Sequence, residues 1–281
     1  GVPVLQAAIA SRDALPRSVA GVLAEVGAAE ACLALLENRN ADIAAFSVGR
    51  IAERHGDLGS VREALLARDD LPPATRHTLI TKLSQTLAGF VAGRQWLKVD
   101  HALRIARESC EKMTVALAAE MPEGEVGPLI RHLRESAQLN TGLILRALLS
   151  GNLVLFEEAL AELAEIPVAR VSGLIYDGAF AGLKALFEKA GLPASTYPAF
   201  KEAIEAMREG GFISEPGGAA RLKQRMIERV LTRCESEDLG DVAPLITLLH
   251  RFATEAAREE ARQLCDELAA DDLYVEAAAA A

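Results

Sequence analysis

The sequence predicts an all-α protein, and three features support this prediction. Aromatic residues make up only 4% of the 281 residues, while Ala, Leu and Glu, which lose little side-chain freedom in a helix, are abundant. Apolar residues recur at helical spacing, for example at Phe156, Leu160 and Leu163. No stretch shows sustained period-two alternation bounded by hairpin turns, so we expect essentially no strand.

The starts of several helices are marked by an apolar residue followed by proline, at Pro16, Pro72, Pro167 and Pro193. Proline suits the first turn of a helix because its missing N–H has no intrahelical partner there. The intervals between these prolines are close to multiples of about 30 residues, and Leu36 and Leu66, in similar contexts, lie 30 residues apart. We therefore predict a HEAT-like α-α superhelix built from stacked antiparallel helix pairs.

Two longer helices interrupt the rhythm of short ones. Residues 73–92 form the first, and the apolar spacing from Val99 to Leu117 predicts a second that ends before Pro122. We expect them to pair as a longer central helical hairpin. Further along the chain, Asn140 stands where an N-cap residue belongs, and Gly151 stands where a left-handed residue would end a helix.

A change in composition divides the chain into a helical-repeat domain, residues 1–211, and an acidic C-terminal helical hairpin with a tail, residues 212–281. The glycine-rich stretches at 210–211 and 217–218 lack the Lys and Ser or Thr of a phosphate-binding loop, so we interpret them as a linker. From Phe212 onward there are 8 Lys or Arg and 14 Asp or Glu. Residues 221–233 and 242–269 are predicted to form the two helices of the hairpin, with a frayed end after Glu276.

Net charge, the length of apolar runs and the spacing of the cysteines argue against several function classes. The net charge of −10 disfavours binding to nucleic acid, and no apolar run approaches the roughly 20 residues of a membrane-spanning helix. The four cysteines, Cys32, Cys110, Cys234 and Cys265, are dispersed, which favours free, packed thiols in a reducing cytoplasm. Because the chain starts at Gly1 without Met, we expect a truncated sequence that lacks an N-terminal piece.

The five histidines form no metal-binding or catalytic motif. His77 and His132 each lie on a predicted amphipathic helix, a setting that also suits a phosphoacceptor histidine in a signalling bundle. Cys110 has no base at helical spacing that could activate it as a nucleophile. The sequence therefore predicts no catalytic, cofactor-binding or metal-binding residues, no cofactor and no enzymatic activity.

Five of the twelve aromatic residues fall between positions 176 and 200. They are Tyr176, Phe180, Phe187, Tyr197 and Phe200. We interpret this cluster as the densest part of the core, and a peptide-binding pocket is the alternative.

Residues 159–175 and 182–204, and more loosely 71–87 and 129–152, resemble a bacterial family of unknown function, domain-of-unknown-function family 2336, which is mainly alphaproteobacterial. The resemblance covers residues 60–210, and the tail after Gly211 lies outside it. It implies an all-helical cytoplasmic protein and provides no site residue to carry over.

The function predicted from these observations is a non-catalytic scaffold or adaptor that binds another protein, since solenoids present extended concave surfaces. This inference is by analogy of fold. The alternatives are a phosphotransfer module that uses His77 or His132, and a ligand-binding protein with a pocket between the two long helices. A homodimer and a regulatory role are left open.

Overall fold

A computed structural model of the chain describes residues 1–176, 180–210, 224, 226–232 and 243–279. The regular elements in these residues are helices, with no strand among them, which confirms the all-α prediction. The chain divides into two compact units, unit 1 (Gly1–Met121) and unit 2 (Pro122–Ala281). The predicted division at residues 211 and 212, and the predicted glycine-rich linker, fall outside the described residues or at their edge, so both stay predictions.

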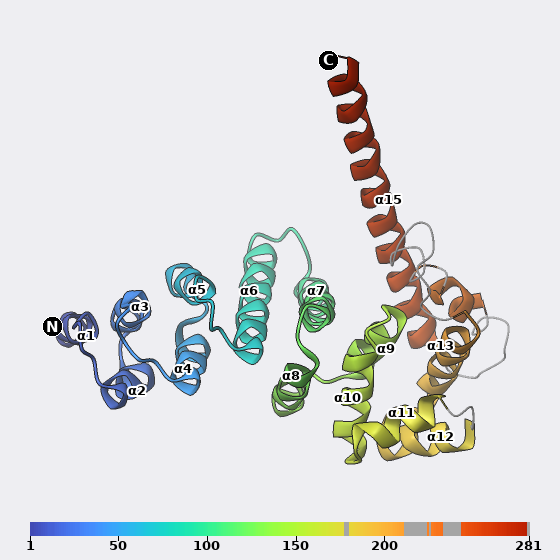
Figure 1. Cartoon of the computed structure of the whole chain (residues 1–281), viewed down its shortest axis with the longest axis horizontal. Helices are drawn as coiled ribbons and strands as arrows, with labels where there is room; N and C mark the ends of the chain where they lie inside the picture. The colour runs from blue at the N-terminus through green and yellow to red at the C-terminus, as the bar shows by residue number, and fades with distance from the viewer. Residues whose placement is uncertain (177–179, 211–223, 225, 233–242, 280–281) are drawn as a thin grey trace. The chain divides into compact units, whose positions relative to one another are not determined.

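Unit 1 is formed by helices that pack in an alternating order. Their bounds are α1 (Val2–Ala10), α2 (Arg17–Val26), α3 (Ala29–Glu37), α4 (Ala45–His55), α5 (Gly59–Leu66), α6 (Pro73–Gly93) and α7 (Val99–Ala119). Helix α1 packs on α3 and α3 on α5, while α2 packs on α4 and α4 on α6 (Figure 1). Each of the helices α1 to α4 therefore contacts the second helix after it, so that α1, α3 and α5 form one layer and α2 and α4 another.

Buried apolar residues recur at a fixed interval in unit 1. Leu15, Ile43 and Leu71 each stand two positions before a helix, 28 residues apart, and are 5–7% exposed. A second series follows inside the same helices, at Leu23, Ile51 and Leu79, again 28 residues apart and at most 5% exposed. The interval is thus slightly shorter than the 30 residues predicted.

The predicted helix starts and caps agree with the structure. Helices α2 and α6 begin directly after Pro16 and Pro72. The Asn140 side chain accepts a hydrogen bond from the N–H of Leu143 at 2.9 Å, as an N-cap residue does. Gly151 has φ of 74°, the left-handed conformation expected after a helix. These features depend on only a few neighbouring residues, which is why the sequence reveals them.

Unit 2 begins with a group of short helices. Their bounds are α8 (Glu123–Glu135), α9 (Thr141–Leu149), α10 (Leu153–Ala164), α11 (Val168–Tyr176), α12 (Phe180–Lys189), the 3₁₀ turn η1 (Ala194–Thr196) and α13 (Tyr197–Gly210). Helix α10 contacts α8, α9, α11 and α12. All residues of α9 from Leu143 to Leu149 are buried, so this helix is packed on every side.

The chain of unit 2 ends with α15 (Ala243–Ala279), which extends ten residues past the predicted end at Ala269 and includes positions where fraying was expected. Residues 226–232 are also helical. The buried residues of α15 fall on one stripe, at Leu245, Leu249, Phe252 and Ala256. After Ala256 the described side chains, as far as Asp266, are half-buried or exposed.

Candidate docking surface

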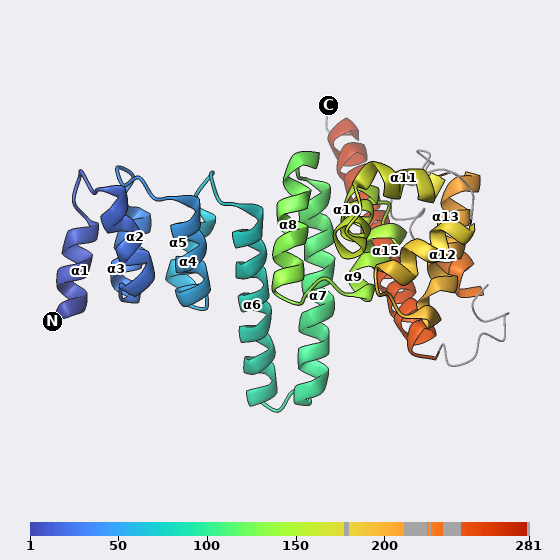
Figure 2. The same ribbon diagram turned by 90° about the horizontal axis from the view of Figure 1, so that it is seen from below.

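The predicted long hairpin is confirmed: α6 and α7 have 21 residues each, lie side by side, and extend past the ends of α4 and α5 (Figure 2). The first turns of α6 are packed, with His77 and Leu79 1% exposed. Beyond Leu79, only Ala88 of α6 is buried. The rest of the hairpin carries large apolar side chains that are 37–68% exposed, namely Leu83, Leu87, Phe90, Trp96, Val99, Leu103 and Ile105.

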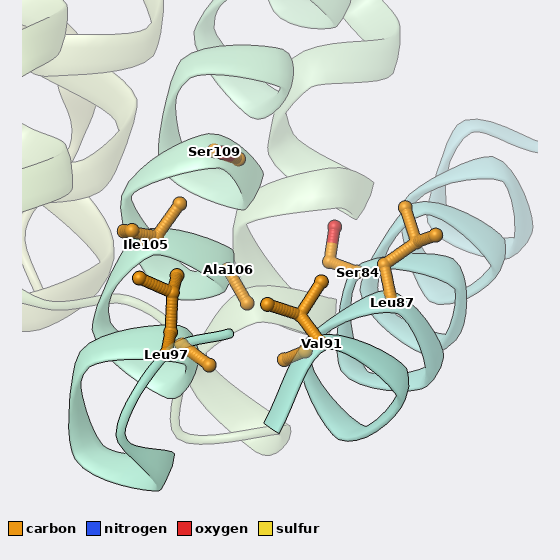
Figure 3. Close-up of a pocket in the computed structure, with 9 residues that line it drawn as sticks. Ser84, Leu87, Val91, Leu97, Ile105, Ala106 and Ser109 are labelled. Carbon is orange, nitrogen blue, oxygen red and sulfur yellow. The ribbon is translucent and has the colours of Figure 1, made fainter. Parts of the chain in front are cut away.

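A groove runs between α6 and α7 at this exposed part of the hairpin. Side chains from both helices point toward one another across it (Figure 3). Its lining residues are Ser84, Leu87, Ala88, Val91, Leu97, Ala102, Ile105, Ala106 and Ser109. The only hydroxyl side chains among them are those of Ser84 and Ser109, and none of the nine is charged.

The groove is small, with a volume of about 180 Å³. Small-molecule sites in proteins typically measure about 300–1,000 Å³ and contain a few convergent polar groups that fix the ligand's orientation. The stretch from Ser84 to Val91 covers about two helical turns. A groove of this size, length and chemistry suits a few apolar side chains from a neighbouring helix.

An aromatic cluster lies near the end of the hairpin. Phe90 and Trp96 meet edge to face, with ring centroids 5.9 Å apart, and the guanidinium of Arg94 lies 5.3 Å from the centre of the Phe90 ring. Although Phe90 and Trp96 contact each other, both side chains remain at least half exposed to solvent. Trp and Arg are the residues most often found at energetically important positions in protein interfaces.

The hairpin also differs from the rest of the chain in charge. Residues 82–112 contain six basic residues and three acidic ones, whereas the remaining residues contain 24 basic and 37 acidic. The six basic residues are Lys82, Arg94, Lys98, Arg104, Arg107 and Lys112. The apolar groove therefore belongs to a locally basic segment of an acidic protein.

The histidines considered for phosphotransfer do not share a site. His77 is 1% exposed in α6 of unit 1, and His132 is half-buried in α8 of unit 2. A phosphoryl donor has no access to the His77 ring in this conformation.

The cysteines occupy different environments. Cys32 and Cys110 are buried free thiols, as predicted, and burial raises the pKa of the Cys32 thiol despite the nearby guanidinium of Arg54. The prediction that all four cysteines are packed is wrong for Cys265, which is exposed on α15. Among the described side chains of its helix, the last buried one is Ala256, which the sequence did not indicate. Cys234 lies outside the described residues.

The aromatic cluster predicted as core is confirmed as core for two of its members. Phe187 and Phe200 are at most 3% exposed, with ring centroids 4.8 Å apart, and Phe200 also stacks on Phe156 at 6.1 Å. Tyr197 packs edge to face on Phe187 at 5.6 Å. Tyr176 is 51% exposed instead, and its hydroxyl donates to the carboxylate of Glu157 at 3.1 Å.

A second cavity in unit 1, of about 510 Å³, lies beside the ends of α3 and α5. It is lined largely by charged residues, among them Glu37, Arg39 and Asp69. The guanidinium of Arg68 donates two hydrogen bonds, of 2.8 and 2.9 Å, to Asp70 and lowers the pKa of that carboxyl. These two charged groups are already satisfied by each other, so this cavity offers less to a partner than the hairpin does.

In the part of the chain that the structure describes, no group of three or more His, Cys, Asp or Glu side chains is placed to hold a metal ion. Within the same residues, no helix is both long enough and apolar enough to cross a membrane.

Residues 1–240 match the model of a protein family described as "Uncharacterised protein conserved in bacteria (DUF2336)". The chain belongs to this family. The match confirms the resemblance drawn from the sequence and extends it beyond residues 60–210. Searches of curated proteins and of solved structures found no match. In this DUF2336 protein the hairpin of α6 and α7 lies inside the matched residues, whereas α15 lies outside them.

Proposed function

We propose that this protein is a non-catalytic, cytoplasmic scaffold that binds another protein, and that the groove between α6 and α7 receives a helix of that partner. The observation that carries this proposal is the exposure of large apolar side chains around an uncharged groove. A contiguous apolar surface is costly to leave in water and marks interaction sites in many proteins.

The alternating packing of unit 1 supports a scaffold role. Helices α1 to α4 each contact the second helix after them, and buried residues repeat every 28 positions. Both features suit a HEAT-like stack of helix pairs. In such a stack the core holds its shape while exposed side chains are free to vary. The packed first turns of α6 attach the hairpin to this stack, so the groove is preformed before a partner binds, which lowers the entropy lost on binding.

A helix fits the groove better than the alternative ligands do. Helix-in-groove recognition uses apolar anchors spaced three or four residues apart, and two turns of lining residues match one such pair. A small metabolite would find only two hydroxyl side chains to orient it. The burial of His77 also speaks against phosphotransfer there, which leaves the half-buried His132 for that alternative.

The test compares two matched substitutions, Leu87→Glu in the groove and Leu66→Glu outside it. Both leucines are helical, and their exposed fractions are 54% and 51%. Tagged wild-type protein and both variants are used to recover partners from bacterial lysate, and each recovered protein is purified and its affinity measured by titration calorimetry. We expect one partner whose binding is lost with Leu87→Glu and kept with Leu66→Glu.

Three results would contradict this proposal. Equal loss of binding in both variants would show that the groove has no special role. A metabolite that co-purifies with wild type and not with Leu87→Glu would support the ligand-binding alternative. Transfer of phosphate to the protein, abolished by His132→Ala, would support the signalling alternative.

A further inference from the structure

Helix α15 has two parts with different surroundings. The stripe from Leu245 to Ala256 is buried in unit 2, where the Arg146 guanidinium donates to the Glu255 carboxylate at 2.6 Å. The following residues, 257–279, extend the same helix by about 35 Å. Where its side chains are described, this second part is exposed or half-buried, with Leu264 49% exposed. Figure 1 shows α15 reaching beyond the other helices of unit 2.

The second part of α15 is opposite in charge to the hairpin. Residues 264–281 contain five acidic residues and no basic one. The acidic residues, which include the adjacent pairs Asp266-Glu267 and Asp271-Asp272, are separated by apolar stretches, and Leu264 and Leu268 are four positions apart. This spacing equals about one turn of helix, and the groove between α6 and α7 is about two turns long.

We propose that the acidic end of α15, residues 264–279, of one copy docks in the apolar groove of a second copy. The proposal deepens the proposed function, on which it rests, because it names an occupant of the same groove. The acidic end of α15 has two properties that suit the groove. It is helical, and its negative charge is complementary to the basic residues of the hairpin.

Pairing between two copies explains why both surfaces occur on one chain. If each copy gives its helix end to the groove of the other, the contact is made twice around a two-fold axis, and the assembly closes as a dimer. The second contact is then intramolecular and adds affinity without a new type of interaction. Bound in this way, the helix end competes with any other helical partner for the groove.

Salt dependence distinguishes this pairing from a contact between two hairpins. Attraction between the basic hairpin and the acidic helix end weakens as the Debye length falls from about 8 Å at 0.15 M to about 3 Å at 1 M salt. Two hairpins facing each other would bring like charges together, so salt would strengthen their contact instead.

The experiment measures self-association of the full chain by sedimentation equilibrium, with charge reversals on either side. One variant is Lys98→Glu with Arg107→Glu, both exposed on the hairpin, and the other is Asp271→Lys with Asp272→Lys. We expect a wild-type dimer that weakens with salt, and a dissociation constant at least about tenfold higher for each variant alone. Joining both pairs in one chain restores dimerisation. Circular dichroism confirms that the variants keep the helical content of wild type.

Other outcomes overturn the proposal. A wild-type chain that is monomeric at all concentrations and salts refutes it, as does a dimer that salt strengthens or that the combined variant does not restore. A monomer that sediments with phosphatidylglycerol vesicles through Lys98 and Arg107 would assign the hairpin to a lipid surface. A monomer that still binds a bacterial protein in a Leu87-dependent way would refute the dimer and leave the proposed function standing.

Discussion

Glu158 on α10 is a carboxylate in an unfavourable position. Burial raises its pKa, and the neighbouring charges of Glu162 and Glu157 raise it further. Its ionised form is therefore less stable in the folded chain than in the unfolded chain. By contrast, Glu162 receives a hydrogen bond of 2.9 Å from Arg134, so its charge is compensated.

We predict that Glu158→Gln stabilises the protein at pH 7 by a few tenths to about 1 kcal/mol, since the site is partly exposed to solvent. Because the folded-state pKa is raised, the wild-type penalty is present above that pKa and disappears as the pH falls through it. The advantage of the variant over wild type should therefore shrink on acidification. Urea unfolding between pH 7 and pH 4 measures this difference.

The control for Glu158 is Glu162→Gln, which removes one partner of Arg134 and should lose less than about 1 kcal/mol. A destabilised Glu158→Gln variant, or a gain that does not depend on pH, would contradict the assignment.

Two glycines of unit 1 are predicted to respond in opposite ways to a methyl group. A Cβ at Gly56 would lie 2.4 Å from the Ala52 carbonyl oxygen and 2.8 Å from Leu79 Cδ2, whereas a Cβ at Gly89 meets nothing within 4 Å. We expect Gly56→Ala to cost about 1–3 kcal/mol through overpacking, and Gly89→Ala in α6 to add about 0.5–1 kcal/mol of helix stability. Thermal unfolding of both variants gives the comparison, and equal effects would argue against close packing at Gly56.

Among elements, α9 and α15 are joined by an ion pair that local sequence does not reveal. Arg146 is 3% exposed, its guanidinium lies 4.3 Å from the centre of the Phe252 ring, and its partner Glu255 is 109 residues away. Removing one member of such a pair leaves a buried charge without compensation. The packed part of α15 therefore belongs to the core of unit 2.

We predict that Glu255→Gln destabilises unit 2 by about 3 kcal/mol, the lower end of the range for broken buried pairs, because the Glu255 side chain is 26% exposed. Replacing both Arg146 and Glu255 by Met should recover most of this loss. Urea midpoints give the values, with Glu135→Gln, an exposed carboxylate at the end of α8, as the control that changes little. No recovery in the double variant would show that the pair is not the cause.

The sequence predicts the elements of this protein better than their surroundings. Helix starts at Pro16 and Pro72 and the cap at Asn140 follow from a few adjacent residues. The exposure of Leu87 or Cys265 depends on whether another helix covers that side, and this is decided by contacts distant in sequence. The sequence predicts the hairpin and, in the ligand-binding alternative, a pocket between its two helices; it does not predict that large apolar side chains around this groove are exposed. The available signal was the apolar stripe of Leu83, Leu87, Phe90 and Val91, whose spacing of i, i+4, i+7 and i+8 gives α6 an apolar face along this part of its length.

At the scale of the whole molecule, unit 1 has a hydrophobic core of its own. The buried residues that make up this core run from Ala10 to Leu79 and come from α1 to α6 and the segments that join them. Leu79 of α6 is 1% exposed in this core and α6 packs on α4, so α6 is needed to cover α4. A unit with a contiguous core of its own is expected to fold alone.

We predict that residues 1–121 fold as an independent unit. The fragment should be helical by circular dichroism and unfold in one cooperative transition, because its core contains no residue from beyond Met121. A fragment of residues 1–66 is the matched comparison: it lacks α6 and exposes the faces that Leu71 and Leu79 cover, so it should lose cooperativity. In the full chain, amide hydrogen exchange should then show the core amides of α2 to α4 opening together. If residues 1–121 are unfolded while the full chain is folded, unit 1 depends on residues after Met121 and the 28-residue series does not define a self-sufficient stack.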